Sequence, residues 1–136
     1  MRANELFRRT VPLAIASTLA LAPARAQGRG AQFTHADTLR GSFRKVDIVG
    51  RYGGEEFVIA MPDTNTDTAI QKLERLRQAI ADTPMSITKD GVSAAVTISA
   101  GLAGFPDDGR EEEQLLSAAD GRLFRAKATG RNRIVR

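Results

Sequence analysis

The sequence predicts an α+β fold, in which helices pack on an antiparallel sheet, and three observations lead to this prediction. A pair of glycines, Gly53 and Gly54, joins two strand-like runs. Gly-Gly between β-rich runs favours a tight hairpin, because both residues can take a positive φ without steric cost. Apolar residues recur at helical spacing over residues 67–82 and alternate over residues 92–102. Strand pairs interspersed with helices are typical of this fold class.

The first elements of the body surround the glycine pair. Residues 36–43 are expected to form the last turns of a helix, since Leu39 and Phe43 lie four positions apart on one face. Residues 46–51 and 56–61 are the expected arms of the hairpin. Residues 67–82 follow as an amphipathic helix that ends before a proline, and its apolar face carries Ala69, Leu73, Leu76 and Ile80.

The second half repeats the pattern of strands followed by a helix. Residues 85–88 are expected to form a short strand, and residues 92–102 one longer alternating strand. Residues 111–128 are expected to form a helix with acidic residues in its first turn, where the helix dipole favours them. Gly130 is placed to end this helix, and residues 132–135 close the chain as a strand.

Composition limits the chemistry that the chain can perform. With 136 residues it is long enough for one domain. It has no cysteine and a single histidine, His35, so a thiolate or histidine zinc site is excluded. The net charge of +4 comes from residues 1–30, which hold five arginines and one glutamate; the remainder carries 15 basic and 15 acidic residues. A neutral body argues against nucleic acid as a partner.

Residues 1–34 differ from the globular body at 35–136. A positive start, an apolar run at 11–22 too short to cross a membrane, and Ala24-Arg25-Ala26 resemble a secretory signal peptide cleaved before Gln27. The alternative is an unrelated Ala- and Arg-rich segment joined to a truncated domain. The many small alanines and the lack of alternation predict that residues 11–22 do not form a strand, and the segment is expected to be largely disordered.

Three sets of side chains carry candidate chemistry. Glu55 and Glu56 follow the glycine pair, so two carboxylates lie beside bare backbone, where they can hold a hard divalent cation. Lys127 and Arg131 are four residues apart at a helix end and could grip one anionic group. On spacing alone, a basic helix end that neutralises the dipole is the favoured interpretation of that pair.

A further charged pair precedes the hairpin. Arg44 and Asp47 are three residues apart, and five residues separate Asp47 from Gly53. Without other information they are interpreted as a solvated ion pair between helix and strand, which contributes little to stability.

Taken together, these residues resemble the GGDEF family of diguanylate cyclase domains. The signature stands at 51–57 as Arg-Tyr-Gly-Gly-Glu-Glu-Phe, with Glu in the third place of the motif. Further motifs follow at family spacing in residues 96–101, 118–127 and 130–133, so the resemblance covers roughly residues 36–136. It implies a nucleotidyl-cyclase-like (palm, ferredoxin-like) antiparallel sheet with packed helices.

The resemblance also implies an activity and its residues. Two domains would meet as a homodimer, each holding one GTP, and would make cyclic di-GMP and two pyrophosphates. Glu55 is implied to be the ligand of Mg²⁺ (or Mn²⁺) and a candidate proton acceptor, with Glu56 as second acid. Gly53 and Gly54 would let GTP approach the backbone, and Lys127 and Arg131 would bind its β- and γ-phosphates.

The resemblance assigns a second site to the charged pair. Arg44 and Asp47 match the family's product-inhibition motif, which binds cyclic di-GMP. Arg75, on the following helix, is a candidate second arginine of that site because of its similar helix position.

The sequence also departs from the family pattern. The first strand with its metal-binding aspartate, the phosphate-binding turn after it, and the helix with guanine-binding Asn and Asp have no counterpart; the acids before the hairpin are Glu5, Asp37 and Asp47. We therefore expect a domain without its first strand and helix that makes little or no cyclic di-GMP. The alternatives are a non-catalytic cyclic di-GMP receptor and an inactive remnant. GTP as substrate predicts a cytoplasmic location, and a working signal segment would instead predict export or membrane association.

Overall fold

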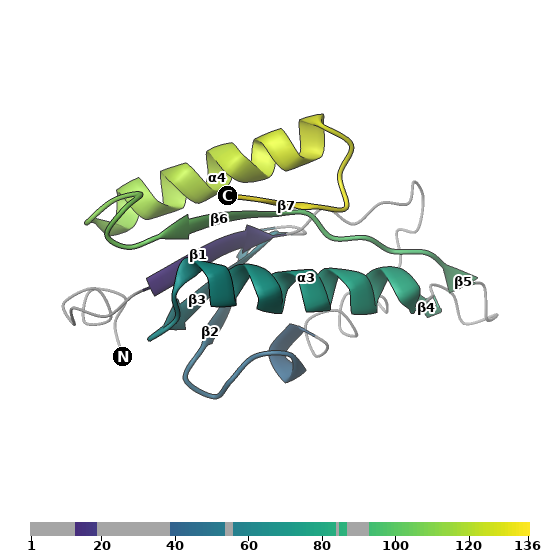
Figure 1. Ribbon diagram of the computed structural model, residues 1–136. Helices are drawn as coiled ribbons and strands as arrows, with labels where there is room; N and C mark the ends of the chain where they lie inside the picture. The colour runs from purple at the N-terminus through teal and green to yellow at the C-terminus, as the bar shows by residue number, and fades with distance from the viewer. Residues whose placement is uncertain (1–12, 19–38, 54–55, 84, 87–92) are drawn as a thin grey trace.

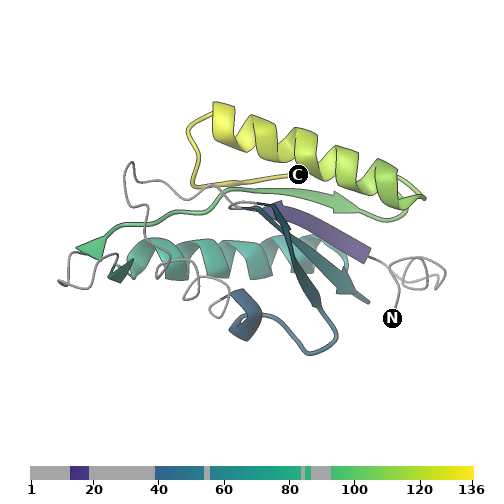
Figure 2. The same cartoon turned by 180° about the vertical axis from the view of Figure 1, so that it is seen from behind.

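The computed structural model describes residues 13–18, 39–53, 56–83, 85–86 and 93–136 (Figure 1). It has the predicted α+β class: a five-stranded sheet in the order β2-β3-β1-β6-β7, a separate pair β4-β5, and two long helices. In both views α4 and α3 lie on opposite sides of the sheet (Figures 1 and 2). The elements are β1 Leu13–Thr18, β2 Ile48–Gly53, β3 Glu56–Pro62, α3 Thr66–Asp82, β4 Met85–Ser86, β5 Ser93–Ala94, β6 Ala100–Gly104, α4 Glu112–Ala128 and β7 Ile134–Val135.

The central strand of the sheet is β1, which comes from the segment that was expected to be a leader. It pairs antiparallel with β3 from Leu13↔Pro62 to Thr18↔Phe57, and with β6 on its other side. The predictions that residues 11–22 form no strand and that the domain has no first strand are therefore wrong, because Leu13–Thr18 takes that place in the sheet. Both helices lie against β1, and a strand covered on both faces needs no polar–apolar alternation. The division into a leader at 1–34 and a body at 35–136 otherwise stays a prediction.

The two faces of the sheet have different partners, because successive side chains of a strand point to opposite faces. On β3, Ile59 and Met61 pack with Ala69 and Leu73 of α3. Phe57 points to the same face and packs with the C-terminal half of α3. The alternate residues Val58 and Ala60 pack toward α4, against a cluster made of Ala103, Leu115 and Ala119.

Helix α3 has the bounds and the buried face that the apolar spacing predicts, shifted by one residue at its start. Asn65 caps it, since the side-chain Oδ1 of Asn65 accepts a hydrogen bond of 2.8 Å from the backbone N–H of Thr68. The buried residues are Ala69, Leu73, Leu76 and Ile80, as expected.

Helix α4 ends in a turn that places its last basic residues. Gly130 has a φ of +118°, a conformation that L side chains rarely adopt. The backbone N–H of Arg131 then donates to the carbonyl of Ala126 over 2.9 Å, the bond that closes a Schellman turn. The predicted role of Gly130 at the end of this helix is thus confirmed.

The strand expected over residues 92–102 is divided in two. Ser93–Ala94 pairs with Met85–Ser86 in the small sheet, whereas Ala100–Gly104 joins the main sheet between β1 and β7. Residues 95–99 connect them without strand pairing, although Val96 and Ile98 are buried there. Alternation of apolar residues predicts which side chains are buried but does not predict which backbone segments pair. The prediction of a single strand over residues 92–102 was therefore wrong.

No helix in the described part of the chain is long and apolar enough to cross a membrane.

Candidate functional site

The registers of the sheet bring the signature hairpin and the end of α4 to the same edge. One row of paired residues crosses all five strands of the main sheet, and its members are Arg51, Phe57, Thr18, Ala100 and Ile134. Glu56 starts β3 one residue before this row, and β7 begins on it. The hairpin and the loop that joins α4 to β7 therefore share one end of the molecule.

The hairpin itself is confirmed as a pair of antiparallel strands. Gly53 pairs with Glu56, and the register shifts between Arg51 and Gly53, so the strand is irregular next to the turn. Gly54 and Glu55 lie outside the described residues, and their predicted roles stay predictions.

Glu56 points to the α4 side of the sheet, as Val58 and Ala60 do, and it meets Lys127 there. The Nζ of Lys127 lies 3.0 Å from Oε1 of Glu56, although 71 positions separate the two residues. The Lys127 side chain is 28% exposed and the Glu56 side chain 42% exposed, so solvent reaches the pair. The signature carboxylate and the predicted phosphate-gripping lysine are thus joined directly.

The loop after α4 holds the second predicted phosphate residue, Arg131, in an unusual backbone conformation. Arg131 and Asn132 have φ values of +57° and +46° directly after Gly130, and left-handed backbone at non-glycine residues is costly and often found at functional sites. Asn132 is held from α3, since Nη1 of Arg77 donates to its Oδ1 over 2.9 Å. Arg131 itself is exposed at the same end as Lys127.

The described residues do not assemble a site for a divalent metal. No group of three or more His, Cys, Asp or Glu side chains comes together among them. Glu56 is paired with Lys127, and β1, the strand beside β3, has the sequence Leu-Ala-Ile-Ala-Ser-Thr without a carboxylate. A hard cation needs several oxygen ligands, so this part of the chain does not fit it. The predicted ligand Glu55 lies outside the described residues.

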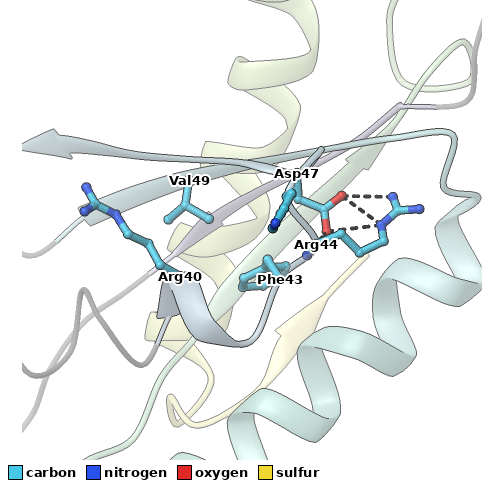
Figure 3. A pocket seen from close by; sticks show the side chains of 6 residues that line it. Arg40, Phe43, Arg44, Asp47 and Val49 are labelled. Atoms are coloured by element: carbon cyan, nitrogen blue, oxygen red, sulfur yellow. Dashed lines mark hydrogen bonds and ion pairs between the residues drawn. The ribbon is translucent and has the colours of Figure 1, made fainter.

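Arg44 and Asp47 form an ion pair joined by several hydrogen bonds, called here the Arg44 clamp, so the guanidinium of Arg44 is already engaged (Figure 3). The Nη2 of Arg44 is 2.9 Å from Oδ1 of Asp47, and its Nε is 3.2 Å from the same oxygen. Nη2 also donates to the Pro62 carbonyl and to Oγ1 of Thr64, each over 2.7 Å. The Asp47 side chain is fully buried. The interpretation as a solvated pair is therefore wrong, because the carboxylate lies in the protein interior.

The clamp shifts the pKa of both partners. Burial by itself would raise the pKa of Asp47, but hydrogen bonds from the side chain and backbone of Arg44, with the charge of Lys72, bring the pKa below its ordinary value. The hydrogen bond to Asp47 raises the pKa of Arg44. Both groups are charged at neutral pH.

A hollow of about 290 Å³ lies beside the clamp. Its lining combines three cationic side chains, two apolar ones and the carboxylate of the clamp, namely Arg40, Arg44, Lys45, Phe43, Val49 and Asp47. In Figure 3 the Arg44 guanidinium turns toward Asp47, whereas Arg40 extends the other way.

The residue of α3 that reaches this clamp is Lys72, which the sequence analysis did not single out. Its Nζ lies 3.4 Å from Oδ2 of Asp47. The predicted second arginine, Arg75, is exposed on the same helix. The sequence gives one weak indication of this role: Lys72 directly precedes the buried Leu73, so its side chain is expected at the border of the buried face of the helix.

A second clamp, also missed, fixes the loop before α4. The Nη2 of Arg122 is 2.6 Å from Oδ1 of Asp108, and its Nη1 donates to the Leu102 carbonyl over 2.8 Å. The hydrogen bond from Arg122 lowers the pKa of Asp108. This clamp joins α4 to the end of β6 and has a structural role.

Comparison with known proteins identifies the family. The family model described as "Diguanylate cyclase, GGDEF domain" matches residues 30–133. This chain belongs to the GGDEF family. Diguanylate cyclases of this family in general require a divalent metal.

Curated relatives contain the domain within much longer chains. The response regulator PleD of Caulobacter vibrioides is 39% identical over 97 residues, which are 71% of this chain and 21% of the relative. The diguanylate cyclase DgcP of Pseudomonas aeruginosa is 42% identical over 100 residues, which are 73% of this chain and 14% of the relative. The chain thus spans about a fifth or less of these relatives.

Solved structures share the fold of this GGDEF domain. The GGDEF domain of YfiN from Pseudomonas aeruginosa superposes with a TM-score of 0.83 at 23% identity, covering 98% of this chain and 79% of that one. The GGDEF domain of DgcB from Caulobacter crescentus, in complex with c-di-GMP, gives 0.80 at 20% identity, covering 97% and 81%. At 98% coverage the likeness extends into β1, although the family model begins only at residue 30.

Proposed function

We propose that this chain is a GGDEF domain of the diguanylate cyclase type that binds nucleotide phosphates at the end of α4 but lacks a complete catalytic set. The reaction of the complete site would join two GTP molecules into cyclic di-GMP and release two pyrophosphates. The observation that carries the proposal is the strand β1, which occupies the centre of the sheet beside Glu56 without supplying a carboxylate. A single signature hairpin is then left to hold the metal.

The basic residues at the C-terminal end of α4 support the proposed binding of nucleotide phosphates. The C-terminal end of a helix carries partial negative charge, which repels phosphate. Binding there depends on cations, and Lys127 and Arg131 supply them at the same end as the hairpin. Gly53 and Gly54 have no side chains that would keep a nucleotide from the backbone. Phosphoryl transfer depends mainly on such positioning and charge neutralisation.

The complete activity would also require a divalent metal and a second copy of the domain. In a complete site Mg²⁺ or Mn²⁺ would neutralise the phosphates; here Glu55 is the signature side chain left for the metal, because Glu56 is paired with Lys127. Two copies would be needed, because each domain would hold one of the two GTP molecules. A cytoplasmic location follows from this substrate.

Product analysis tests the proposal. Purified full-length chain is incubated with GTP and either Mg²⁺ or Mn²⁺, and nucleotides are separated by liquid chromatography. We expect little or no cyclic di-GMP, while GTP binding is measurable by calorimetry and weaker in Lys127→Met. Robust turnover would overturn the proposed loss of catalysis, and absence of GTP binding would overturn the proposed phosphate site.

The second candidate is a non-catalytic receptor that binds cyclic di-GMP at the Arg44 clamp. The hollow beside the clamp, with cationic and apolar walls, favours it, and the DgcB structure contains this nucleotide. Binding would require Arg44 to leave Asp47 and contact the nucleotide, with Arg75 as the candidate second arginine.

Calorimetry with cyclic di-GMP decides the second candidate. Arg44→Ala should abolish the heat of binding and Arg75→Ala should reduce it, while Arg136→Ala, which removes an exposed arginine elsewhere, should not. Circular dichroism checks that Arg44→Ala is folded, so that a lost heat of binding is not the result of unfolding. If the unaltered chain gives no heat of binding with cyclic di-GMP, the receptor function is contradicted. If it also shows no cooperative thermal transition, the chain is an inactive remnant.

A further inference from the structure

We propose that Glu56 is a charge latch on Lys127: it holds the lysine in the ligand-free protein, and a polyphosphate must displace it. This inference rests on the proposed phosphate site and adds to it a control on phosphate affinity. In this arrangement the second signature carboxylate acts through Lys127, so that Glu56 is a positioning residue for the phosphate group.

The fold brings these two side chains together from separate elements. Glu56 starts β3 on the face covered by α4, and Lys127 lies in the last turn of that helix. Their contact of 3.0 Å spans 71 positions of the chain. Because α4 is seated on β6 at Gly101, where an added Cβ would meet the backbone of Ala119 and Leu123, the helix end cannot move away from the hairpin without disturbing the core.

The pair is placed where exchange with a ligand is easy. Four basic residues gather at this end of α4: Arg125, Lys127, Arg131 and Arg133. Within the described residues, Lys127 is the one of the four that is paired with a carboxylate. Both partners are partly exposed, and an exposed pair is weak. A polyphosphate with several negative oxygens can therefore replace a single carboxylate on the lysine.

A latch and a purely structural ion pair predict opposite results when the carboxylate is neutralised. If Glu56 competes with phosphate, Glu56→Gln frees Lys127 and raises anion affinity. If the pair only orients Lys127 for the ligand, the same change lowers affinity. The effect of breaking an exposed pair corresponds to about a twofold to fivefold change in affinity.

The experiment measures binding of inorganic tripolyphosphate to the full chain by calorimetry, in EDTA and at fixed salt because screening alters such affinities. Glu56→Gln should bind about twofold to fivefold tighter than the unaltered chain. Lys127→Met should bind more weakly, and adding Glu56→Gln to Lys127→Met should give no gain. The double variant assigns the gain to the lysine.

Asp67→Asn is the matched control for the change in net charge. Asp67 also forms an ion pair, 2.9 Å from Arg136, and it lies in the first turn of α3, beyond the opposite end of β3. Its replacement should leave tripolyphosphate affinity unchanged. Equal or weaker binding by Glu56→Gln, or an equal gain in Asp67→Asn or in the Lys127→Met background, would overturn the latch. Because metal and GTP are absent, these results are independent of whether the domain turns over GTP.

Discussion

Lys72 and Asp47 lie 3.4 Å apart between Nζ and Oδ2, so the middle of α3 is joined to the connection that precedes β2. Asp47 also accepts hydrogen bonds from the backbone N–H and guanidinium of Arg44. The fully buried carboxylate of Asp47, with its two cationic partners, therefore holds α3 and the connection before β2 together.

Asp47→Asn should therefore destabilise the domain, because it removes the charge that balances Arg44 and Lys72. We expect the free energy of unfolding to fall by about 1–3 kcal/mol, measured by urea denaturation. Asp67→Asn serves as the control, since its pair with Arg136 is exposed on both sides and its loss should cost less than about 0.5 kcal/mol. Equal losses in the two variants would contradict the structural role of Asp47.

Acid should weaken the domain in a defined range. The pKa values of Asp47 and Asp108 lie below their ordinary value of 3.8 in the folded state. A carboxyl with a lowered folded pKa contributes stability above its unfolded pKa and loses it as the pH falls through the folded pKa. The free energy of unfolding should therefore fall steeply below about pH 4. Asp108→Asn should make this fall shallower, and an unchanged slope in that variant would contradict the assignment.

Disrupting β1 should unfold the sheet, because this strand pairs on both sides. Ile15 pairs with Ala60 of β3 and with Ala103 of β6. Ile15→Pro removes a backbone donor from a central strand, so we expect loss of a cooperative thermal transition in circular dichroism. Ile15→Val keeps the donor and should retain the transition. A normal melt for the proline variant would show that β1 is dispensable.

Two glycines give a matched pair of alanine substitutions. At Gly101 an added Cβ would collide with the backbone of α4, whereas at Gly121 it meets open space. Gly101→Ala should lower the free energy of unfolding by about 2 kcal/mol. Gly121→Ala, within the exposed side of α4, should raise it by about 0.5–1 kcal/mol. Chemical denaturation of both variants checks the seating of α4 on β6, and stabilisation by both would contradict it.

The elements that sequence predicts well are those whose burial is one-sided. Helix α3 buries Ala69, Leu73, Leu76 and Ile80, and the spacing of these residues is sufficient to find it. The strand β1 was missed because Leu13–Thr18 lies between two strands with a helix on each side, where alternation is not required. The division of residues 92–102 was missed because burial of Val96 and Ile98 does not require strand pairing.

Prediction of the candidate site from the sequence has a similar limit. Motif spacing predicted the signature hairpin and the basic end of α4, and the registers of the sheet place both at one end. The ion pair between Glu56 and Lys127 and the contact of Lys72 with Asp47 join residues far apart in the chain. Such contacts depend on which face of the sheet each helix covers, and a local pattern carries no information about that.

The central claim is that the hairpin of this GGDEF domain lacks the carboxylate that should face it from β1. Its most direct test is the amount of cyclic di-GMP formed by the purified full chain with GTP and Mg²⁺ or Mn²⁺. We predict that the amount does not differ from that formed by the Glu55→Ala variant. Sustained formation of cyclic di-GMP that Glu55→Ala abolishes would contradict the claim.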